Sequence, residues 1–444
     1  MAQDDSGVLR QRAASLLGPL RLRYFRRLWV ADMVSLFGDW AGRLALSVLV
    51  LERTGSPAWA AAVTAVSLAG FVGIGQVLAT FADRYGRVAV MIVADLARAA
   101  LFAAMLLPIG VGWLLVLAFL AGLATPPFEA ARAAALPDLV PEGRYGEALA
   151  LSGVSVQSSL VIGYALGGLL LTVVDAETAL FINAMSFILS AVLLLELRHT
   201  PAAEPAGVTA TVGQSLGVGA SSLWSDRLVR RALVIVAITG ALGTVAEALV
   251  VPYSVEIGLP KGALGLLAAA IPVGTLLGTA AIATGARDHH RLLRNAAWCA
   301  AVTSACAAPL FWLEASGAFA FVAFAIAGGI FAVSIPTNQV IGLRLSRDNR
   351  ASAMGIAVGV LMGSQALGAA LGGLVASQVG SAQAITGALV ATTAFGLWSA
   401  VSTPHEAKHL RRARPRAAMA RRATPETVVD LVSMEADRPP AGIS

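Results

Sequence analysis

The chain has 444 residues, of which 57% are hydrophobic and 13% are charged, and its mean hydropathy is +0.76. Soluble domains carry roughly 25% charged residues, so this chain lacks the polar surface that one or two conventional cores would need. Its net charge of +6 sits in short arginine clusters between apolar runs, a pattern that indicates membrane topology and argues against a nucleic-acid partner.

A membrane-spanning helix needs about 20 mostly apolar residues. Such runs predict an all-α polytopic membrane protein. In chain order the twelve predicted spans cover residues 28–51, 58–82, 88–108, 111–131, 148–173, 178–197, 232–254, 262–285, 294–313, 317–342, 352–377 and 383–402.

The spans fall into two six-helix halves, residues 28–197 and 232–402. Residues 1–27 are polar and hold no apolar stretch typical of a cleavable signal peptide, so we expect a cytoplasmic N-terminal segment. Residues 198–231 are predicted to link the halves. Residues 403–444 form a basic tail rich in arginine and proline, which we expect to be disordered.

The distribution of lysine and arginine predicts the orientation of the chain in the membrane. With the N-terminus in the cytoplasm, 28 of the 32 lysines and arginines lie on the cytoplasmic side, whereas only Arg53 and Lys261 lie outside. This asymmetry predicts that both termini are cytoplasmic. We therefore expect the chain to lie in a bacterial cytoplasmic membrane.

The two halves repeat a glycine pattern with an offset of 205 residues. Both copies run through the membrane in the same direction, so they indicate a parallel repeat. Small residues four positions apart allow helix backbones to approach closely. The predicted packing glycines are Gly163, Gly167 and Gly168 in the first half and Gly368, Gly372 and Gly373 in the second.

The two parts of the linker differ in their sequence pattern. Its first part contains Pro201 and Pro205 and is expected to be flexible. From Ser215 to Arg231, apolar residues such as Leu223 and Leu228 recur at helical spacing. This part is predicted to be a helix along the cytoplasmic membrane surface.

Several strings resemble the major facilitator superfamily, and within it the bacterial exporters that include enterobactin and macrolide efflux proteins. The loop between spans 2 and 3 is similar to the superfamily's loop motif, although Ala79 and Val88 replace its usual glycine and second basic residue. The strings are Phe25-Arg-Arg-Leu-Trp29, Ser35-Leu-Phe-Gly38-Asp39-Trp40, Thr54-Gly-Ser-Pro57, Ala82-Asp83-Arg84-Tyr85-Gly86-Arg87, Ala135-Leu-Pro137-Asp138-Leu-Val-Pro141 and Phe181-Ile-Asn183-Ala-Met-Ser186-Phe187.

The resemblance implies a major facilitator fold and a secondary transporter that works by alternating access. The activity it implies is proton-coupled export of a moderately hydrophobic small molecule: a drug, a natural product or a siderophore. Two alternatives stay open, an importer or uniporter of a similar solute and a non-transporting sensor or membrane enzyme. We expect no cofactor and no metal, an ion gradient (H⁺) as the energy source, the lipid bilayer as surroundings and a functional monomer.

Ionisable residues inside a bilayer cost at least about 2.5 kcal/mol each and usually mark function. Asp39 lies eleven residues into the first predicted span, and Arg43 follows one turn later on the same face. Because the superfamily's first span lines the central cavity, Asp39 and Arg43 are the candidates for proton coupling. The alternative is a static ion pair that stabilises the bundle.

Three further intramembrane charges are candidates for other roles. Asp95 and Arg98 are three residues apart in the third span and are predicted to pair as peripheral packing. Glu247 in the seventh span lies at a depth similar to that of Arg43. We therefore hypothesise that Arg43 and Glu247 form an outer gate in the inward-facing state.

The loop motif Asp83, Arg84, Gly86 and Arg87 is expected to form a cytoplasmic latch, with Asp83 meeting Arg347 or Arg350 of the other half. Ordinary positive-inside topology accounts for the arginines but not for Asp83. Uncharged polar residues within the spans are candidates for lining a substrate cavity or for bonding a neighbouring helix. They are Gln157, Tyr164, Asn183, Asn338 and Gln365.

One sequence pattern suggests an enzyme. His405-Glu406-Ala-Lys-His409 fits the H-E-x-x-H pattern of zinc proteases. It directly follows the last span, where no catalytic domain surrounds it, so a solvated segment is the favoured interpretation. No G-x-x-x-x-G-K-[ST] phosphate-binding loop occurs, which argues against transport driven by a nucleotide site in this chain.

Overall fold

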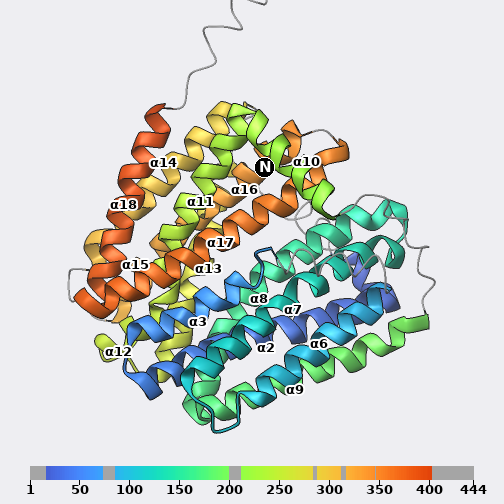
Figure 1. The fold of residues 1–444 in the computed structure, drawn as a ribbon, viewed down its shortest axis with the longest axis horizontal. Coiled ribbons are helices and arrows are strands. Elements are labelled where there is room, and N and C mark those ends of the chain that lie inside the picture. The colour runs from blue at the N-terminus through green and yellow to red at the C-terminus, as the bar shows by residue number, and fades with distance from the viewer. Residues whose placement is uncertain are drawn as a thin grey trace, which may run out of the picture. The chain divides into compact units, whose positions relative to one another are not determined.

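The computed structural model describes residues 17–73, 86–199, 212–283, 288–311, 317–345 and 347–402. Within these ranges the chain is helical and has no β-strand, which confirms the all-α class for the part described (Figure 1). The predicted tail and the proline-containing part of the linker lie outside these ranges. So do Asp83, Arg84, His405, Glu406 and His409.

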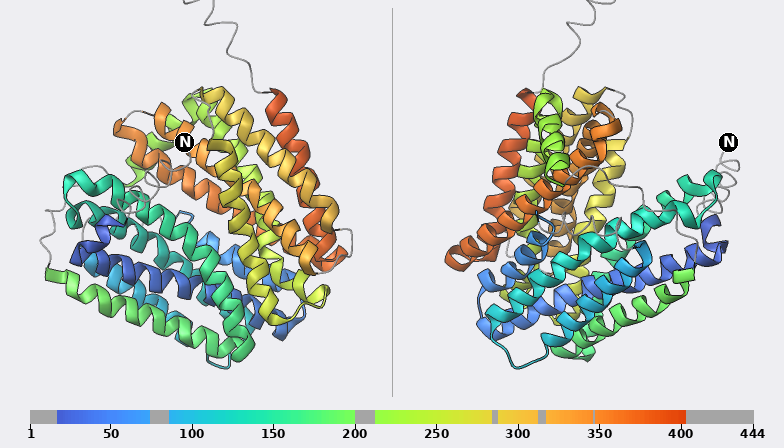
Figure 2. Two further views of the ribbon diagram at one scale, coloured as in Figure 1. Left: turned by 180° about the vertical axis from the view of Figure 1, so that it is seen from behind. Right: turned by 45° about the vertical axis from the view of Figure 1, so that its right-hand side comes forward.

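The described part of the first half contains six α-helices. They lie side by side in Figures 1 and 2, with α2 packed on both α8 and α9, and α6 on α7 and α9. Short 3₁₀ segments occupy Gly18–Arg21, Leu136–Leu139, Glu142–Arg144 and Glu196–His199. The six helices are α2 (Arg23–Thr54), α3 (Pro57–Ala69), α6 (Arg87–Ala104), α7 (Val111–Ala135), α8 (Tyr145–Val173) and α9 (Ala176–Leu195).

The predicted linker contains a helix, α10 (Val212–Ser225), which packs on α17 of the second half. Leu223 of α10 is buried in a cluster with Leu228, Leu293 and Ile341. The remaining elements are α11 (Arg227–Ala248), α12 (Val250–Glu256), α13 (Lys261–Ala283), α14 (His289–Ala307), η5 (Ala308–Phe311), α15 (Gly317–Gly328), η6 (Gly329–Val333), α16 (Ser334–Arg344), α17 (Arg347–Val379) and α18 (Ser381–Ser402).

Aspartates begin three of these helices. Asp175, Asp226 and Asp288 each accept hydrogen bonds from backbone N–H groups in the first turn of α9, α11 and α14. These caps satisfy donors that a helix start would otherwise leave unpaired. At the opposite ends, Gly55 after α2 and Gly380 after α17 have positive φ angles of 62° and 93°, which glycine adopts without strain.

Two predicted single spans are interrupted in the structure. The span predicted at 232–254 divides between α11 and α12, and the span at 317–342 divides into α15, η6 and α16. Pro252 and Pro336 lie just after the breaks and have no N–H to continue the helical ladder. Both regions are nevertheless helical, and the segments Arg227–Ala248 and Gly317–Arg344 are each long and apolar enough to cross a membrane.

Nine helical segments of the described chain are long and apolar enough to cross a membrane, which identifies a multi-pass membrane protein. Three predicted spans do not qualify. Of the span predicted at 58–82, the structure describes residues only up to 73, and α3 within it has 13 residues. Helix α6 carries Arg87, Asp95 and Arg98 within 18 residues, and α14 begins with two histidines and two arginines among its first six residues. The count of twelve and the cytoplasmic position of the termini stay predictions.

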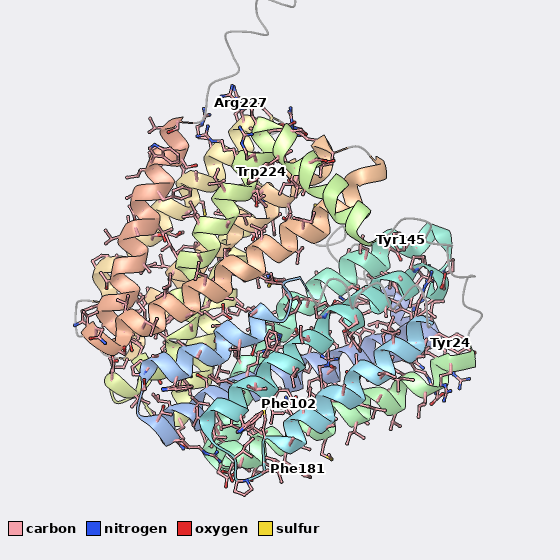
Figure 3. The ribbon with its side chains drawn as sticks, viewed as in Figure 1. Tyr24, Phe102, Tyr145, Phe181, Trp224 and Arg227 are labelled. Atoms are coloured by element: carbon pink, nitrogen blue, oxygen red, sulfur yellow. The ribbon has the colours of Figure 1, made fainter. Side chains whose placement is uncertain are left out.

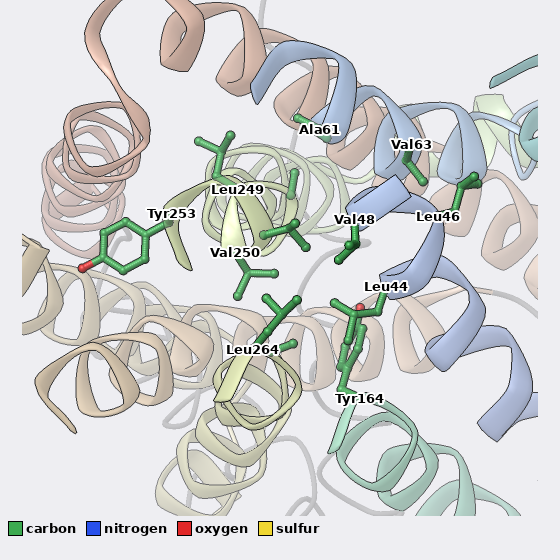
Figure 4. Close-up of a cluster of buried hydrophobic side chains, with 14 of the residues drawn as sticks. Leu44, Leu46, Val48, Ala61, Val63, Tyr164, Leu249, Val250, Tyr253 and Leu264 are labelled. Carbon is green, nitrogen blue, oxygen red and sulfur yellow. The ribbon is translucent and has the colours of Figure 1, made fainter. Parts of the chain in front are cut away.

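The most extensive contacts between the halves join α3 to α17 and α8 to α13. One hydrophobic cluster contains residues of both halves, and Figure 4 shows Leu44 and Tyr164 of the first half near Val250 and Leu264 of the second. We call the end of the bundle where α2 turns into α3 the Gly55 end, and the opposite end, near the last turn of α7, the Arg132 end.

Candidate functional site

A cavity of about 760 Å³ lies between the halves, within the range of about 300–1,000 Å³ typical of small-molecule sites. Helices α2, α3, α7 and α8 line it from the first half, and α11, α12, α13, α16 and α17 from the second. Most lining side chains are apolar. Its ionisable residues are Asp39, Arg43, Glu129, Arg132, Tyr164 and Glu247.

Asp39 and Arg43 form an ion pair on the cavity wall. Arg43 Nη2 donates a hydrogen bond of 2.9 Å to Asp39 Oδ2 across one turn of α2. The guanidinium carbon also lies 4.8 Å from the centre of the Trp40 ring, a favourable cation–π distance. Both side chains are largely buried, with 18% of Arg43 and 11% of Asp39 exposed. The predicted pair therefore exists and faces the cavity.

Glu247 has a different partner from the one the sequence suggests. The Tyr164 hydroxyl donates a hydrogen bond of 3.0 Å to Glu247 Oε1, joining α8 to α11 across the halves. Tyr164 also packs against Trp40, with 5.4 Å between ring centres. Among the described residues no ion pair joins Arg43 to Glu247, because Asp39 holds the guanidinium. In this conformation Arg43 and Glu247 do not form the ion pair that the gate hypothesis requires.

Asp95 and Arg98 pair away from the cavity. Asp95 is fully buried and Arg98 is 4% exposed, and an ion pair joins them within α6. The guanidinium lies between Phe128 and Phe187, with its carbon 4.7 Å and 4.4 Å from the two ring centres. This arrangement fits the packing role expected from the sequence.

Sequence reasoning missed three charged residues. Asp32 lies about one turn after the start of the first predicted span and is 3% exposed. Arg132 Nη1 lies 3.4 Å from Asp32 Oδ2, and Arg132 also pairs with Glu129. A carboxylate within an apolar run was the available signal for Asp32. Arg132 was not predicted as a site residue because it directly follows its predicted span, where the positive-inside rule already accounts for an arginine.

The five polar candidates divide between two environments. Gln157, Tyr164 and Gln365 line the cavity. Asn183 and Asn338 are not among its lining residues. Asn183 is 1% exposed and fills the space beside Gly38 and Gly42 of α2, where a Cβ would overlap it. The Asn183 side chain occupies the space that Gly38 and Gly42 leave open, so α9 and α2 can pack closely.

The loop motif is described only in part. Gly86 has a φ of 87° and precedes α6, and Arg87 pairs with Asp138 after α7. This pair connects two of the strings that resemble the superfamily. The predicted latch stays a prediction, because Asp83 and the side chains of Arg347 and Arg350 lie outside the described part.

The repeated glycines occupy equivalent contacts in the two halves. A Cβ at Gly163 or Gly167 would overlap Trp40 or Ala41 of α2, and one at Gly368 or Gly372 would overlap Ala241 or Val245 of α11. The first two glycines of each trio therefore let α8 pack closely on α2 and α17 pack closely on α11.

The third glycine of each trio faces the other half. A Cβ at Gly168 would overlap the backbone of Gly265, and one at Gly373 would overlap Ala58 and Ala61. Nearby, Lys261 Nζ lies 2.6 Å from Glu52 Oε1. The halves are therefore in close contact at the Gly55 end, whereas the cavity extends toward Glu129 and Arg132 at the other end.

The sequence pattern of the Major Facilitator Superfamily matches residues 28–346. The chain belongs to this superfamily. It is 29% identical over 213 residues to the protein named multidrug efflux pump Tap of Mycobacterium tuberculosis H37Rv, covering 45% of this chain and 51% of that one. It is 27% identical over 191 residues to the uncharacterized MFS-type transporter YfiS of Bacillus subtilis, covering 41% and 46%. The matches span about half the length of these curated relatives.

Solved structures share the fold at low sequence identity. An inward-facing, unoccupied bacterial homologue of the human lysosomal transporter Spinster gives a TM-score of 0.67 at 15% identity, covering 85% of this chain and 96% of that one. The nucleoside transporter NupG gives 0.70 at 13% identity, covering 86% and 98%. The family prediction is confirmed, and these likenesses place the described helices in the major facilitator fold.

Proposed function

We propose that this protein is a proton-coupled exporter of a moderately hydrophobic small molecule, working by alternating access. The observation that carries the proposal is the cavity of about 760 Å³ between two repeated halves, with Asp39, Arg43 and Glu247 on its wall. Two halves that share a central site can expose it to either side by rocking.

In this proposal the membrane is crossed twelve times and the Arg132 end faces the cytoplasm. The positive-inside distribution of arginine supports that orientation. The cavity then extends toward the cytoplasm, and the contacts at Gly168 and Gly373 close the outer side. In this proposal the structure therefore represents an inward-facing state.

Proton coupling follows from the partners of Arg43. While Asp39 is ionised it holds the guanidinium through a hydrogen bond of 2.9 Å. A proton on Asp39 would weaken that bond and free Arg43 to attract Glu247 across the interface, because a charged hydrogen bond is stronger than a neutral one. Protonation would in this way change the contacts between the halves, which is what coupling requires.

The substrate class follows from the cavity wall and the relatives. Apolar side chains such as Leu160, Val236 and Phe331 contribute much of the wall, and Gln157 and Gln365 add a few hydrogen-bonding groups. Such a wall suits a molecule that is mostly apolar with a few polar groups. A relative named as a multidrug efflux pump supports export and a drug-like compound or natural product over other cargo.

The test is accumulation of a compound panel, including macrolides and siderophores, in cells that lack their main efflux pumps. Wild type, Asp39→Asn and empty vector are compared with and without a protonophore. We expect lower accumulation that disappears with the substitution and with the protonophore. Higher accumulation would reverse the direction and establish an importer. No change for any compound, together with a silent Asp39→Asn, would favour the sensor or membrane-enzyme alternative.

A further inference from the structure

A second, smaller pocket of about 240 Å³ lies within the first half, between the N-terminal part of α2, the end of α7 and the start of α8. Its wall combines aromatic rings, aliphatic side chains and one ion pair. Phe25, Trp29, Asp32, Arg132, Tyr145 and Gly153 are the lining residues that matter below. Figure 3 labels Tyr145 near one end of the first half, the end that also carries Tyr24 of α2.

Asp32 brings an unmatched acceptor to this pocket. Its side chain is 4% exposed, and its Oδ2 lies 3.4 Å from Arg132 Nη1. Within the part of the chain that the structure describes, Oδ1 has no hydrogen-bond donor. A buried charged oxygen without a donor is costly, so the site favours a ligand that supplies one.

The local charges leave the pocket negative. Arg132 also pairs with Glu129, so two carboxylates share a single guanidinium. By contrast, Asp39 has Arg43 and Asp95 has Arg98 as its own partner. Asp32 therefore has no cation of its own, and its environment suits a positively charged ligand.

The aromatic side chains complete the recognition surface. Trp29 Nε1 donates a hydrogen bond of 2.7 Å to Ser155 Oγ, which holds the indole ring in place. Phe25 is 1% exposed, whereas Tyr145 is 39% exposed at the rim. Rings of this kind contact apolar groups and also attract cations through their faces.

We propose that this pocket binds a small aromatic amine in its protonated form. The ammonium group donates a hydrogen bond to Asp32 Oδ1, and the ring system lies against Phe25 and Trp29. Arg132 and Val156 line both the pocket and the larger cavity, so the two spaces adjoin. Equilibrium binding at this site does not require the protein to transport anything, and it can be measured on the purified chain.

Acidification should weaken the binding, because a proton on Asp32 removes the acceptor and the negative charge together. The titratable and charged groups that face Asp32 come from three neighbouring helices. They are Glu129 and Arg132 on α7, Asp95 and Arg98 on α6, and Tyr145 on α8.

The experiment measures binding of 2-(1-naphthyl)ethylamine to the purified full chain in detergent, with 2-(1-naphthyl)ethanol as the uncharged probe of matched shape. A hydrogen bond to a charged group contributes about 1.5–3 kcal/mol, or roughly a tenfold to hundredfold change in Kd. We expect the alcohol to bind at least about tenfold more weakly, and Asp32→Asn to weaken the amine by a similar factor. Asp32→Glu should retain binding.

Two further variants keep the result interpretable. Gly153 has open space where its Cβ would stand, so Gly153→Phe should fold normally, fill the pocket and block the amine even if Asp32→Asn proves unstable. Asp39→Asn tests the larger cavity instead. Equal binding of amine and alcohol, or binding lost in Asp39→Asn but kept in Asp32→Asn and Gly153→Phe, would overturn the proposal.

Discussion

The Tyr164 hydroxyl donates a hydrogen bond to Glu247 Oε1 at 3.0 Å, and the two residues belong to opposite halves of the molecule. Both also line the central cavity. A change in the cavity that breaks this bond would therefore also weaken the contact between the halves at the Gly55 end.

Removing this bond should favour separation of the halves at the Gly55 end. A hydrogen bond to a charged group contributes about 1.5–3 kcal/mol, so Tyr164→Phe should shift the conformational equilibrium about tenfold or more. Glu247→Gln should act in the same direction, and the double variant should be no worse than the stronger single one. Distances between spin labels on α3 and α17 would measure the shift. Tyr24→Phe, at a tyrosine that is 47% exposed, is the control.

Exchanging charges should distinguish the partner of Arg43. Because Asp39 Oδ2 lies 2.9 Å from Arg43 Nη2, the variant Asp39→Arg/Arg43→Asp should recover part of the transport that each single substitution removes. Arg43→Glu/Glu247→Arg should recover less. Uptake or efflux of the substrate found in the panel gives the measurement. The reverse order of recovery would show that transport does not depend on the Asp39–Arg43 pair, which would contradict the proposed coupling.

A single methyl group at Gly168 should disturb the interface between the halves. Its Cβ would overlap the backbone of Gly265, which belongs to a helix and cannot move aside cheaply. Gly168→Ala should therefore lower transport severalfold while the protein still inserts and folds. Gly387→Ala on α18 is the matched control, since open space surrounds that position. Equal activity of both variants would show that the contact is not needed.

The cap of α11 gives a pH-dependent prediction outside the membrane spans. Partial burial raises the pKa of Asp226, but hydrogen bonds from Arg344 and two backbone N–H groups outweigh it, so the pKa lies below its ordinary value. The stabilisation is present at neutral pH and disappears as the pH falls below about 4. Asp226→Asn should cost less than about 1 kcal/mol at pH 7, because the pair is partly solvated. Thermal unfolding should show the full cost at pH 7 and a smaller one at pH 3.5.

Cross-linking across the Gly55 end should stop transport reversibly. Lys261 Nζ and Glu52 Oε1 are 2.6 Å apart and belong to different halves. Cysteines at both positions, after replacement of Cys299 and Cys306 by alanine, should react with a short reducible cross-linker. Transport should fall to background and return with reductant. Full activity in the cross-linked protein would contradict alternating access at this interface.

Much of this architecture could be predicted from the sequence. Apolar run length located the helices, and the offset of 205 residues between glycine trios located the repeat. The breaks before Pro252 and Pro336 could not be predicted from the prolines, since α7 continues through Pro126 and Pro127 and α13 through Pro272. Helix positions depend on local composition, which explains why this level of prediction succeeded.

The partners of individual side chains were harder to predict. Asp39 with Arg43 and Asp95 with Arg98 are short-range pairs within one helix, which spacing determines. Tyr164 with Glu247, and Asp32 with Arg132, join different helices. Those contacts depend on how each helix is rotated about its axis, and that rotation follows from packing across the whole bundle.

The contacts at Gly168 and Gly373 have a mechanical consequence. Each lets two helices from opposite halves touch almost at the backbone, without a long side chain between them. Because no long side chain has to change rotamer before such surfaces part, the two contacts can open and reclose as rigid surfaces. We therefore expect the outer seam to act as a dry closure, in which α3 leaves α17 and α8 leaves α13 when the halves rock, and all four helices keep their internal structure.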